Sequence, residues 1–263
     1  MSDFDLRSAN LRALNSLTKY PSIPTYHALD PKNGGLLEEP TVFTADVIAT
    51  EKVDGTNARI VFTPDGNYLL GSREELLYAR GDLIGNPALG IVEQLRPVAE
   101  ALGQVVPWSR YLSVYFLELY GGKVGGAARQ YVKDPTVFGW RLFDVATVAG
   151  FEELLGWPSE RISRWRDASG QAWATEEELR ALSSLTGLAL TPRLATIPPH
   201  LMPETASGMN DMLAGWADTR VRLDGGQGRS EGVVFRTADR SVIAKARFQD
   251  YERTMRRLAK AAG

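Results

Sequence analysis

Hydrophobic positions gather in several short stretches that are rich in β-branched, apolar or aromatic residues, a pattern typical of β-strands, and polar residues interrupt them only at single positions. These stretches, bounded by turn residues, lie at 41–49, 58–62, 68–73, 111–122, 137–145, 230–236 and 241–247. Residues 63–67, Thr-Pro-Asp-Gly-Asn, form a strong turn signal between the second and third stretches. The pattern therefore predicts antiparallel strands, with a hairpin over 58–73.

Apolar residues recur at helical spacing in other parts of the chain. Helices are predicted at 3–17, as a packing helix within 1–18, and at 87–102, 175–185, 204–217 and 248–263. Thr175 and Glu178 have the spacing of a capping box, which marks the start of the third helix. Pro97 lies inside the second and predicts a kink or two pieces. Strands and helices in this mixture indicate an α+β fold.

Composition narrows the classes of function. The 263 residues contain no apolar run long enough to span a bilayer, and the first five are acidic where a signal peptide is basic, which predicts a cytoplasmic protein with no membrane partner. Cysteine is absent and histidine occurs twice, so any metal should be a hard ion bound by carboxylates.

The formal net charge of −2 means that a nucleic-acid partner would have to bind a local basic patch. One candidate is the segment 236–263, in which eight basic residues stand against three acidic ones. A solvated face on a terminal helix explains this run equally well.

The strongest chemical candidate is Lys52, in the sequence Glu-Lys-Val-Asp-Gly-Thr-Asn at 51–57. Asp54-Gly55 alone is a common hairpin signal, and a lysine beside it is usually a solvated charge. A functional interpretation requires further polar groups suited to a nucleotide. Glu118 is one, because a carboxylate within an apolar strand is costly unless it is paired or binds a ligand. Arg73, at a predicted strand end near the lysine, fits a site and a plain surface position equally well.

Further candidates lie on the last predicted strands. Lys245 and Arg247 are two residues apart and therefore share one face of a strand. Glu231 begins the sequence Glu-Gly-Val-Val-Phe-Arg, which ends at Arg236. Phe143, beside Asp144, has core packing as its default interpretation.

In this order and spacing, the motifs resemble those of the covalent nucleotidyltransferases, which include ATP-dependent ligases and capping guanylyltransferases. Glu-Lys-Val-Asp-Gly-Thr-Asn, Leu-Glu-Leu-Tyr-Gly and Glu-Gly-Val-Val-Phe-Arg look most similar to the T4 RNA ligase 2-like family of RNA ligases. The resemblance runs from about Lys19 to Arg247. It implies one nucleotidyltransferase (adenylation) domain over 1–263, with antiparallel sheets flanked by helices and a basic C-terminal helix at 248–263.

The resemblance also implies a reaction. The amine of Lys52 would attack the α-phosphorus of ATP, while Lys245, Arg247 and a divalent ion lower its pKa and neutralise phosphate charge. The resulting lysyl-AMP would pass its AMP to an RNA 5′-phosphate, and a 3′-hydroxyl would then displace AMP. The expected cofactors are ATP and Mg²⁺ or Mn²⁺, and the expected partners are RNA ends or a nicked duplex.

Residue roles follow from the same resemblance. Glu118 is expected to hold the ribose, Phe143 to stack on adenine, and Lys245 to contact the α-phosphate. Arg73 and Arg236 would contact ribose or phosphate groups, and Glu51 would belong to the nucleotide site. Glu231 would hold the metal, whereas Asp54 is the acid of the lysine motif, with its role open.

Two departures from the family pattern qualify the expectation. Arg247 stands where the family usually has a second lysine, and the chain ends sixteen residues later, which leaves no space for a separate C-terminal OB or helical domain. A protein partner could then supply the grip on RNA. The alternatives are a capping-type guanylyltransferase, an adenylyltransferase with another acceptor, and an inactive nucleotide- or RNA-binding module.

Overall fold

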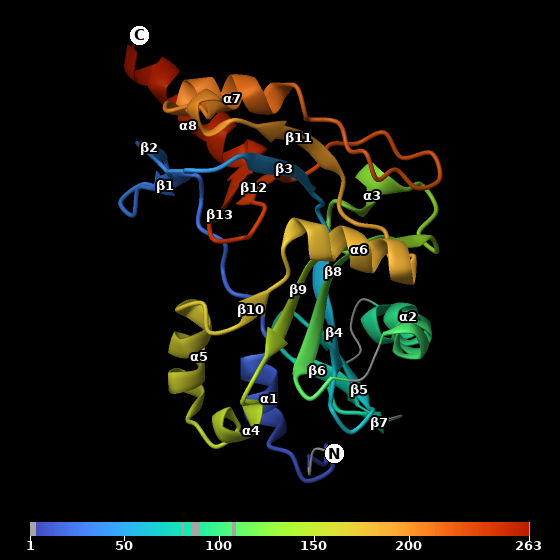
Figure 1. Cartoon of the computed structure of the whole chain (residues 1–263). Helices are drawn as coiled ribbons and strands as arrows, with labels where there is room; N and C mark the ends of the chain where they lie inside the picture. Colours follow the sequence, from blue (N-terminus) through green and yellow to red (C-terminus); the bar gives the residue numbers. More distant parts are fainter. Residues whose placement is uncertain (1–3, 80–81, 86–89, 107–108, 263) are drawn as a thin grey trace. The chain divides into compact units, whose positions relative to one another are not determined.

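The computed structural model describes residues 4–79, 82–85, 90–106 and 109–262. The chain forms two compact units, each assembled from three segments. Unit 1 comprises Met1–Ser22, Gly55–Gly125 and Phe138–Leu190; unit 2 comprises Ile23–Asp54, Gly126–Val137 and Thr191–Gly263. Each unit has its own sheet, and Figure 1 labels the elements.

Unit 1 is built on a sheet in which every neighbouring pair of strands is antiparallel. Its strands, in spatial order, are β10 (Ala172–Trp173), β9 (Phe138–Val148), β8 (Leu112–Gly121), β4 (Thr56–Phe62), β5 (Tyr68–Ser72), β6 (Leu76–Ala79) and β7 (Asp82–Leu83). The helices are α1 (Leu11–Leu17), α2 (Ile91–Val105), α4 (Phe151–Leu154), α5 (Ser159–Asp167) and α6 (Glu176–Thr186).

Both faces of this sheet are buried under helices. Successive side chains of a strand point to opposite faces, so neighbouring residues enter different cores. Ile60 and Leu117 pack in one core with residues of α2 and α6. Val61 and Phe116 pack in the other with residues of α1, α4 and α5. The central strands are therefore almost continuously apolar, and a polar residue on one of them stands out.

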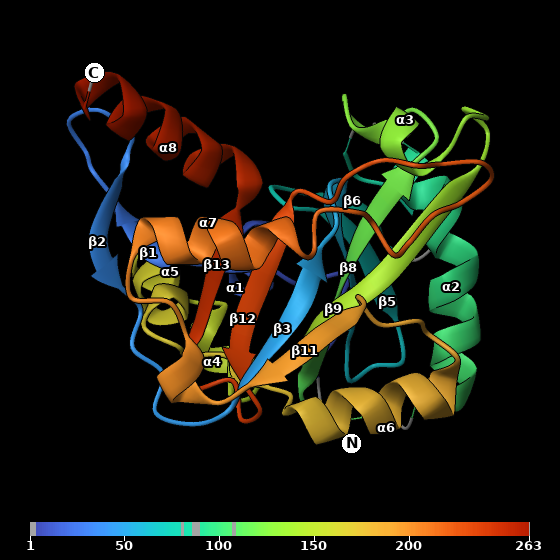
Figure 2. The ribbon, with the colours of Figure 1, turned by 90° about the horizontal axis from the view of Figure 1, so that it is seen from above.

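Unit 2 contains a four-stranded antiparallel sheet in the order β11 (Arg193–Ile197), β3 (Val47–Lys52), β12 (Gly232–Thr237) and β13 (Ile243–Arg247). The strands β1 (His27–Leu29) and β2 (Leu36–Pro40) form a separate pair, and the helices are α3 (Ala128–Tyr131), the short 3₁₀ helix Pro199–Leu201, α7 (Ala206–Ala214) and α8 (Phe248–Ala262). Residues of α7 and α8 pack against one face of the sheet in a single core, and Figure 2 shows α7 lying across the strands.

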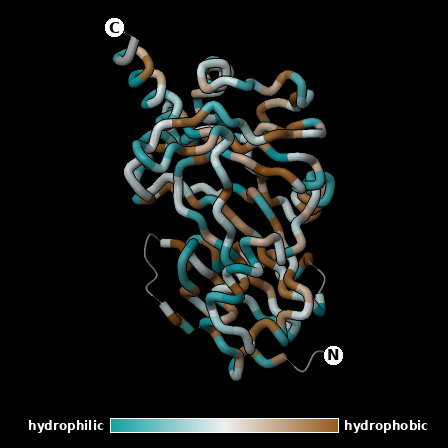
Figure 3. Tube along the Cα trace, turned by 90° about the vertical axis from the view of Figure 1, so that its left-hand side faces the viewer, coloured by the Kyte–Doolittle hydropathy of each residue, from teal (hydrophilic) through white to brown (hydrophobic). Residues whose placement is uncertain are grey.

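The predicted α+β class, with antiparallel sheets flanked by helices, is confirmed. The hairpin over 58–73 forms as β4 and β5, and the capping box of Thr175 and Glu178 begins α6. The predicted terminal helix is α8, along which apolar and hydrophilic positions alternate in Figure 3.

Several boundaries differ from the prediction. The helix predicted over 3–17 begins only at Leu11, because Asn10 caps it by accepting a hydrogen bond from the Ala13 amide; residue 3 lies outside the described residues. The helix predicted over 87–102 begins at Ile91 and runs through Pro97 without a break in assignment. The exposed ring of Pro97 leaves its missing hydrogen bond on the solvent side. Residues 87–89 of that prediction also lie outside the described residues.

Strand predictions differed in several places. The strand predicted over 41–49 is β3, which starts at Val47 and continues to Lys52. Six strands in the described part of the chain were not predicted at all: β1, β2, β6, β7, β10 and β11. None of the described helices is long and apolar enough to cross a membrane.

Candidate functional site

Lys52 lies at the end of β3, on a sheet face that the strand register defines. On β12, Gly232 is paired with both Lys52 and Arg247. One step along, Val234 is paired with Thr50 and Lys245. Because side chains alternate between faces, Lys52, Lys245 and Arg247 share the face opposite the core of α7 and α8.

Gly232 allows β12 and β13 to approach each other closely. A Cβ at this position would lie 2.1 Å from the carbonyl oxygen of Ala246, so no other residue fits without moving the backbone. The preceding residue, Glu231, is held by both neighbours: its amide donates to Lys52 O at 2.9 Å, and its carbonyl accepts from the Phe248 amide at 3.1 Å. Close packing at Gly232 thus fixes the backbone of Glu231, from which its carboxylate side chain extends.

The ammonium group of Lys52 forms an ion pair with the carboxylate of Glu231. The two side chains are 24% and 23% exposed, so the pair is open to a ligand on one side. Asp54 lies beside this pair, and its amide donates to the hydroxyl of buried Tyr131 at 2.7 Å. Burial, followed by the charge of Glu231, raises the pKa of Asp54, while Lys52 opposes the shift.

The carboxylates around Lys52 fit a hard divalent cation better than a transition metal. Among the described residues, no group of three or more His, Cys, Asp or Glu side chains could hold a metal ion. Asp54 and Glu231 supply two oxygen donors, and Mg²⁺ commonly binds through one or two carboxylates, with water and phosphate oxygens completing its shell. The donor set therefore fits a metal that arrives with a nucleotide.

Arg247 is engaged differently from a lysine. Its Nε donates to Asp250 Oδ2 at 2.7 Å and its NH2 group to Oδ1 at 3.2 Å. Asp250 is 1% exposed and also accepts from Arg253 at 2.9 Å. A lysine ammonium cannot reproduce the two-pronged contact, which accounts for arginine at this position. The backbone of Lys245, two residues before Arg247, pairs with residues 24–26.

Glu51 faces the opposite side of β3 from Lys52. Its buried carboxylate accepts from the hydroxyl of Thr219 at 2.5 Å and from the amide of Arg220 at 2.8 Å. These bonds hold the segment around 219–220 against β3. Arg236, buried near the end of β12, is paired with Ile48 and Ile243 and so lies on the face of Lys52, two steps away from it.

The other predicted site residues, Arg73, Glu118 and Phe143, belong to unit 1. Arg73 follows β5 and is exposed, and its Nε lies 3.6 Å from Glu74 Oε1. Glu118 is half-buried on β8, in register with Asn57 and Arg141.

Phe143 occupies an aromatic cluster of unit 1. Its ring centroid lies 5.0 Å from that of Tyr20 and 6.2 Å from that of Phe116, and its side chain packs partly buried against the core. The default core interpretation thus describes its contacts in this structure.

Comparison with known proteins identifies the family of this chain. The RNA ligase family matches residues 45–260. The chain belongs to the RNA ligase family. No curated protein sequence matches it. The matched segment spans every predicted site residue from Lys52 to Arg247 and most of α8.

Solved structures of an RNA ligase from Naegleria gruberi share the fold. A mutant form with ATP and manganese superimposes with a TM-score of 0.53 at 15% identity, covering 90% of this chain and 62% of that one. The form with pyrophosphate gives a TM-score of 0.51 at 15% identity, covering 81% and 52%. This chain therefore spans between half and two-thirds of the length of those chains.

For a member of the RNA ligase family, unit 2 brings together most of the predicted chemistry. Lys52, Asp54, Glu231, Lys245 and Arg247 lie around the ends of β3, β12 and β13. Sequence reasoning missed Asp250 and Thr219. Asp250 could have been found from its spacing of three residues after Arg247 at a helix start, whereas no sequence signal links Thr219 to Glu51.

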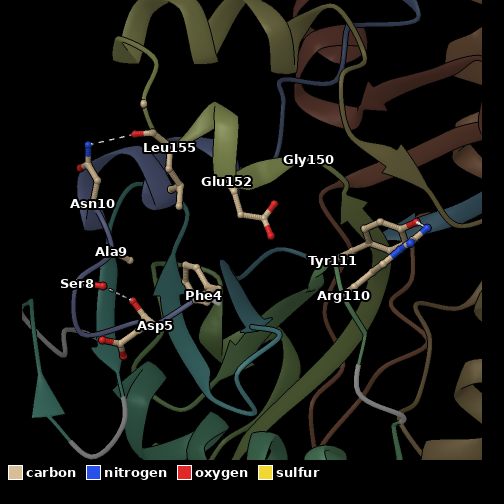
Figure 4. A pocket seen from close by; sticks show the side chains of 11 residues that line it. Phe4, Asp5, Ser8, Ala9, Asn10, Arg110, Tyr111, Gly150, Glu152 and Leu155 are labelled. Atoms are coloured by element: carbon tan, nitrogen blue, oxygen red, sulfur yellow. Dashed lines mark hydrogen bonds between the residues drawn. The ribbon is translucent and has the colours of Figure 1, made fainter. Parts of the chain in front are cut away.

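A groove of about 1010 Å³ in unit 1 contains none of these residues. Figure 4 shows its lining from the N-terminal segment, the start of β8 and the region of α4, including Phe4, Arg110 and Glu152. The ring centroids of Phe4 and Phe151 lie 5.1 Å apart, and Arg110 donates to the hydroxyl of Tyr111. These contacts are local packing and do not involve the predicted site.

Proposed function

We propose that this member of the RNA ligase family is an ATP-dependent RNA ligase similar to T4 RNA ligase 2, which forms a lysyl-AMP intermediate at Lys52. One observation carries the proposal: Lys52 is flanked by two carboxylates, Asp54 and Glu231, on the same sheet face as the cations Lys245 and Arg247. Binding of a nucleotide alone does not require an amine in this position.

In the proposed first step, Lys52 Nζ loses a proton to water and attacks the α-phosphorus of ATP. A P–N bond forms as the bond to the pyrophosphate oxygen breaks. The pair with Glu231 stabilises the charged lysine, so Glu231 must turn from Lys52 before the attack. A divalent cation held by Glu231 and Asp54 would neutralise charge on the phosphates.

The remaining nucleotide contacts are proposed from family resemblance and from position. Lys245 would contact the α-phosphate and Arg236 a phosphate or ribose group from the same sheet face. Glu118 and Arg73 would contribute ribose and phosphate contacts from unit 1. Phe143 would contact adenine through the part of its ring that the core leaves exposed.

In the later steps AMP passes to the 5′-phosphate of an RNA end, and a 3′-hydroxyl attacks that end with release of AMP. The proposed partners are RNA ends or a nicked duplex, together with a protein that adds further grip on RNA.

The test is intact-mass spectrometry after incubation with Mg²⁺ and each nucleoside triphosphate in turn. We expect wild-type protein to gain one adenylate from ATP, and Lys52→Ala to gain none. Gain of guanylate instead would indicate the capping-type alternative. Equal labelling of Lys52→Ala would remove Lys52 from the reaction.

A further inference from the structure

A groove of about 600 Å³ lies in unit 2, between the end of α7 and residue 222. It is lined by residues 214–220 and Arg222, and we call it the arginine groove. The groove contains none of the residues proposed above to bind the nucleotide. It contains two arginines and Trp216, which packs partly buried against the core.

The arginines of the groove project outward from a braced segment. Burial alternates along it: Thr219 and Val221 are each 2% exposed, whereas Arg220 and Arg222 are exposed. The Thr219 amide donates to Gly228 O at 3.1 Å, and the Val221 amide to the Thr219 hydroxyl at 3.2 Å. The two guanidinium groups are thus mounted on a backbone that is fixed on its inner side.

Neither arginine is strongly committed to a protein partner. Arg220 makes one long hydrogen bond, at 3.4 Å, to the carbonyl of Arg193. A guanidinium nitrogen of Arg222 lies 3.9 Å from Asp218 Oδ2, and these two side chains are 47% and 83% exposed. Exposed pairs of this kind contribute little, so an incoming phosphate can displace them.

The segment is anchored to the residue that precedes Lys52 in β3. The Glu51 carboxylate that precedes Lys52 accepts hydrogen bonds from Thr219 and from the amide of Arg220. Arginine binds phosphate through paired N–H groups and is only weakly hydrated, which suits a phosphodiester backbone. Because Glu51 faces the opposite side of β3 from Lys52, the groove lies on the α7 side of the sheet, and an RNA strand bound there would pass around the end of β3 to reach Lys52.

The basic helix α8 is a poorer candidate for this role. Arg253 donates to Asp250 and to the carbonyl of Gly34, and Arg257 donates to Asn33. Two of its arginines therefore hold the segment 33–34 of the protein itself.

We infer that the arginine groove binds the phosphate backbone of the RNA strand presented to Lys52. This inference rests on the proposed ligase function and adds the location of the RNA contact. Phosphate contacts carry no sequence information, so binding at the groove should depend weakly on sequence and strongly on salt.

The experiment compares two double variants of the full chain that lose the same charge. One is Arg220→Gln with Arg222→Gln, and the other is Arg256→Gln with Lys260→Gln, two exposed cations of α8. Binding of a fluorescent single-stranded RNA with a 5′-phosphate is followed by anisotropy over a range of KCl concentrations. Melting temperature and self-adenylylation with ATP alone are measured in parallel.

We expect the groove variant to bind RNA on the order of tenfold more weakly at low salt. Its plot of log affinity against log salt should be shallower by about 1.4, because each phosphate contact on a single strand contributes about 0.7. Melting and adenylylation should stay unchanged, and the α8 variant should match wild type in every measurement.

Other results overturn the inference. Unchanged RNA binding in the groove variant, or an equal loss in both variants, excludes the arginine groove as the RNA contact, while retained adenylylation leaves the ligase proposal standing. Loss of RNA binding in the groove variant, with no adenylate on wild-type protein, supports the groove and contradicts the ligase chemistry.

Discussion

The guanidinium of Arg247 makes two bonds to a carboxylate that is 1% exposed, which ties the end of β13 to the first turn of α8. A buried carboxylate left without one of its donors retains the cost of its desolvation. At the scale of single residues, the second basic position of the Lys-x-Arg motif is therefore mainly a clamp, and the proposed phosphate contact falls to Lys245.

Arg247→Lys is expected to lower the free energy of unfolding by about 2 kcal/mol, because hydrogen bonds to charged groups contribute about 1.5–3 kcal/mol. Urea denaturation measures this, with Arg256→Lys on the exposed side of α8 as the matched control. Equal stability of both variants would show that the clamp contributes nothing.

Lys245→Ala is expected to behave in the opposite way. Its adenylylation rate should fall on the order of 10²-fold or more, as when a transition-state donor is removed, with little change in stability. Single-turnover adenylylation measures the rate. A near-normal rate would exclude Lys245 from the reaction.

Asp54 gives a pH dependence whose sign follows from its raised pKa. Burial and Glu231 make the folded protein bind this proton more tightly than the unfolded chain does. The free energy of unfolding therefore falls as pH rises from the ordinary carboxyl pKa, about 3.9, through the raised value. Below the ordinary pKa the carboxyl is protonated in both states and does not lower stability. Above the raised pKa the loss of stability from the ionised Asp54 is fully present.

Asp54→Asn should remove this cost and melt at a higher temperature than wild type at neutral pH, with the difference shrinking toward about pH 4. Calorimetry across this range tests the effect, and Asp46→Asn, an exposed position of the same unit, serves as control. A gap that widens as pH falls would reverse the assigned direction.

At the scale of elements, the segment after β5 depends on a buried arginine of β4. Arg59 is fully buried, and burial lowers its pKa to about 9. It donates to the carbonyl of Arg73 at 3.2 Å and to Asn15 of α1, while Asn15 donates to the carbonyl of Glu74 at 3.0 Å. The arrangement holds the backbone from which the Arg73 side chain extends.

Arg59→Met is expected to keep or raise the melting temperature, because an apolar side chain of similar length removes a buried charge. We expect the KM for ATP to rise on the order of tenfold, since Arg73 loses its fixed position. Arg12→Met, an exposed position on α1, is the control. An unchanged KM would mean that Arg59 serves packing alone.

Elements also show which parts of the fold the sequence could predict. β8 and β9 carry long apolar runs, and Thr175 with Glu178 marks a helix start, so local signals sufficed. β11 has a half-buried pattern with little alternation, and its pairing with β3 comes from distant sequence.

The sequence after Lys52 shows why a local signal can mislead. Asp54-Gly55 resembles a hairpin turn, yet β3 and β4 on either side of it belong to different sheets. A Cβ on Gly55 would lie 2.2 Å from the carbonyl of Leu119, so close packing on β8 requires this glycine. The shared face of Lys245 and Arg247 followed from strand period, whereas the bonds from Glu51 to Thr219 depend on tertiary contacts.

At the scale of the whole molecule, the net charge of −2 means that the proposed RNA binding depends on local cations. In the proposed reaction ATP binds beside the cations of its own site, whereas binding of RNA releases counterions condensed along the length of the polyanion. We expect rising KCl to depress end joining far more steeply than self-adenylylation. Measuring both half-reactions over one salt series tests this, and parallel slopes would contradict it.

The order of strands in unit 2 has a consequence for protein synthesis. β3 is translated early, but its two neighbours in the sheet, β11 and β12, follow more than a hundred residues later. Until they emerge from the ribosome, the apolar strand that carries Lys52 has no partner in its own sheet. A product released before residue 232 would expose the edge of Val47–Lys52, which favours pairing with other chains, so premature termination should yield aggregates rather than a smaller enzyme.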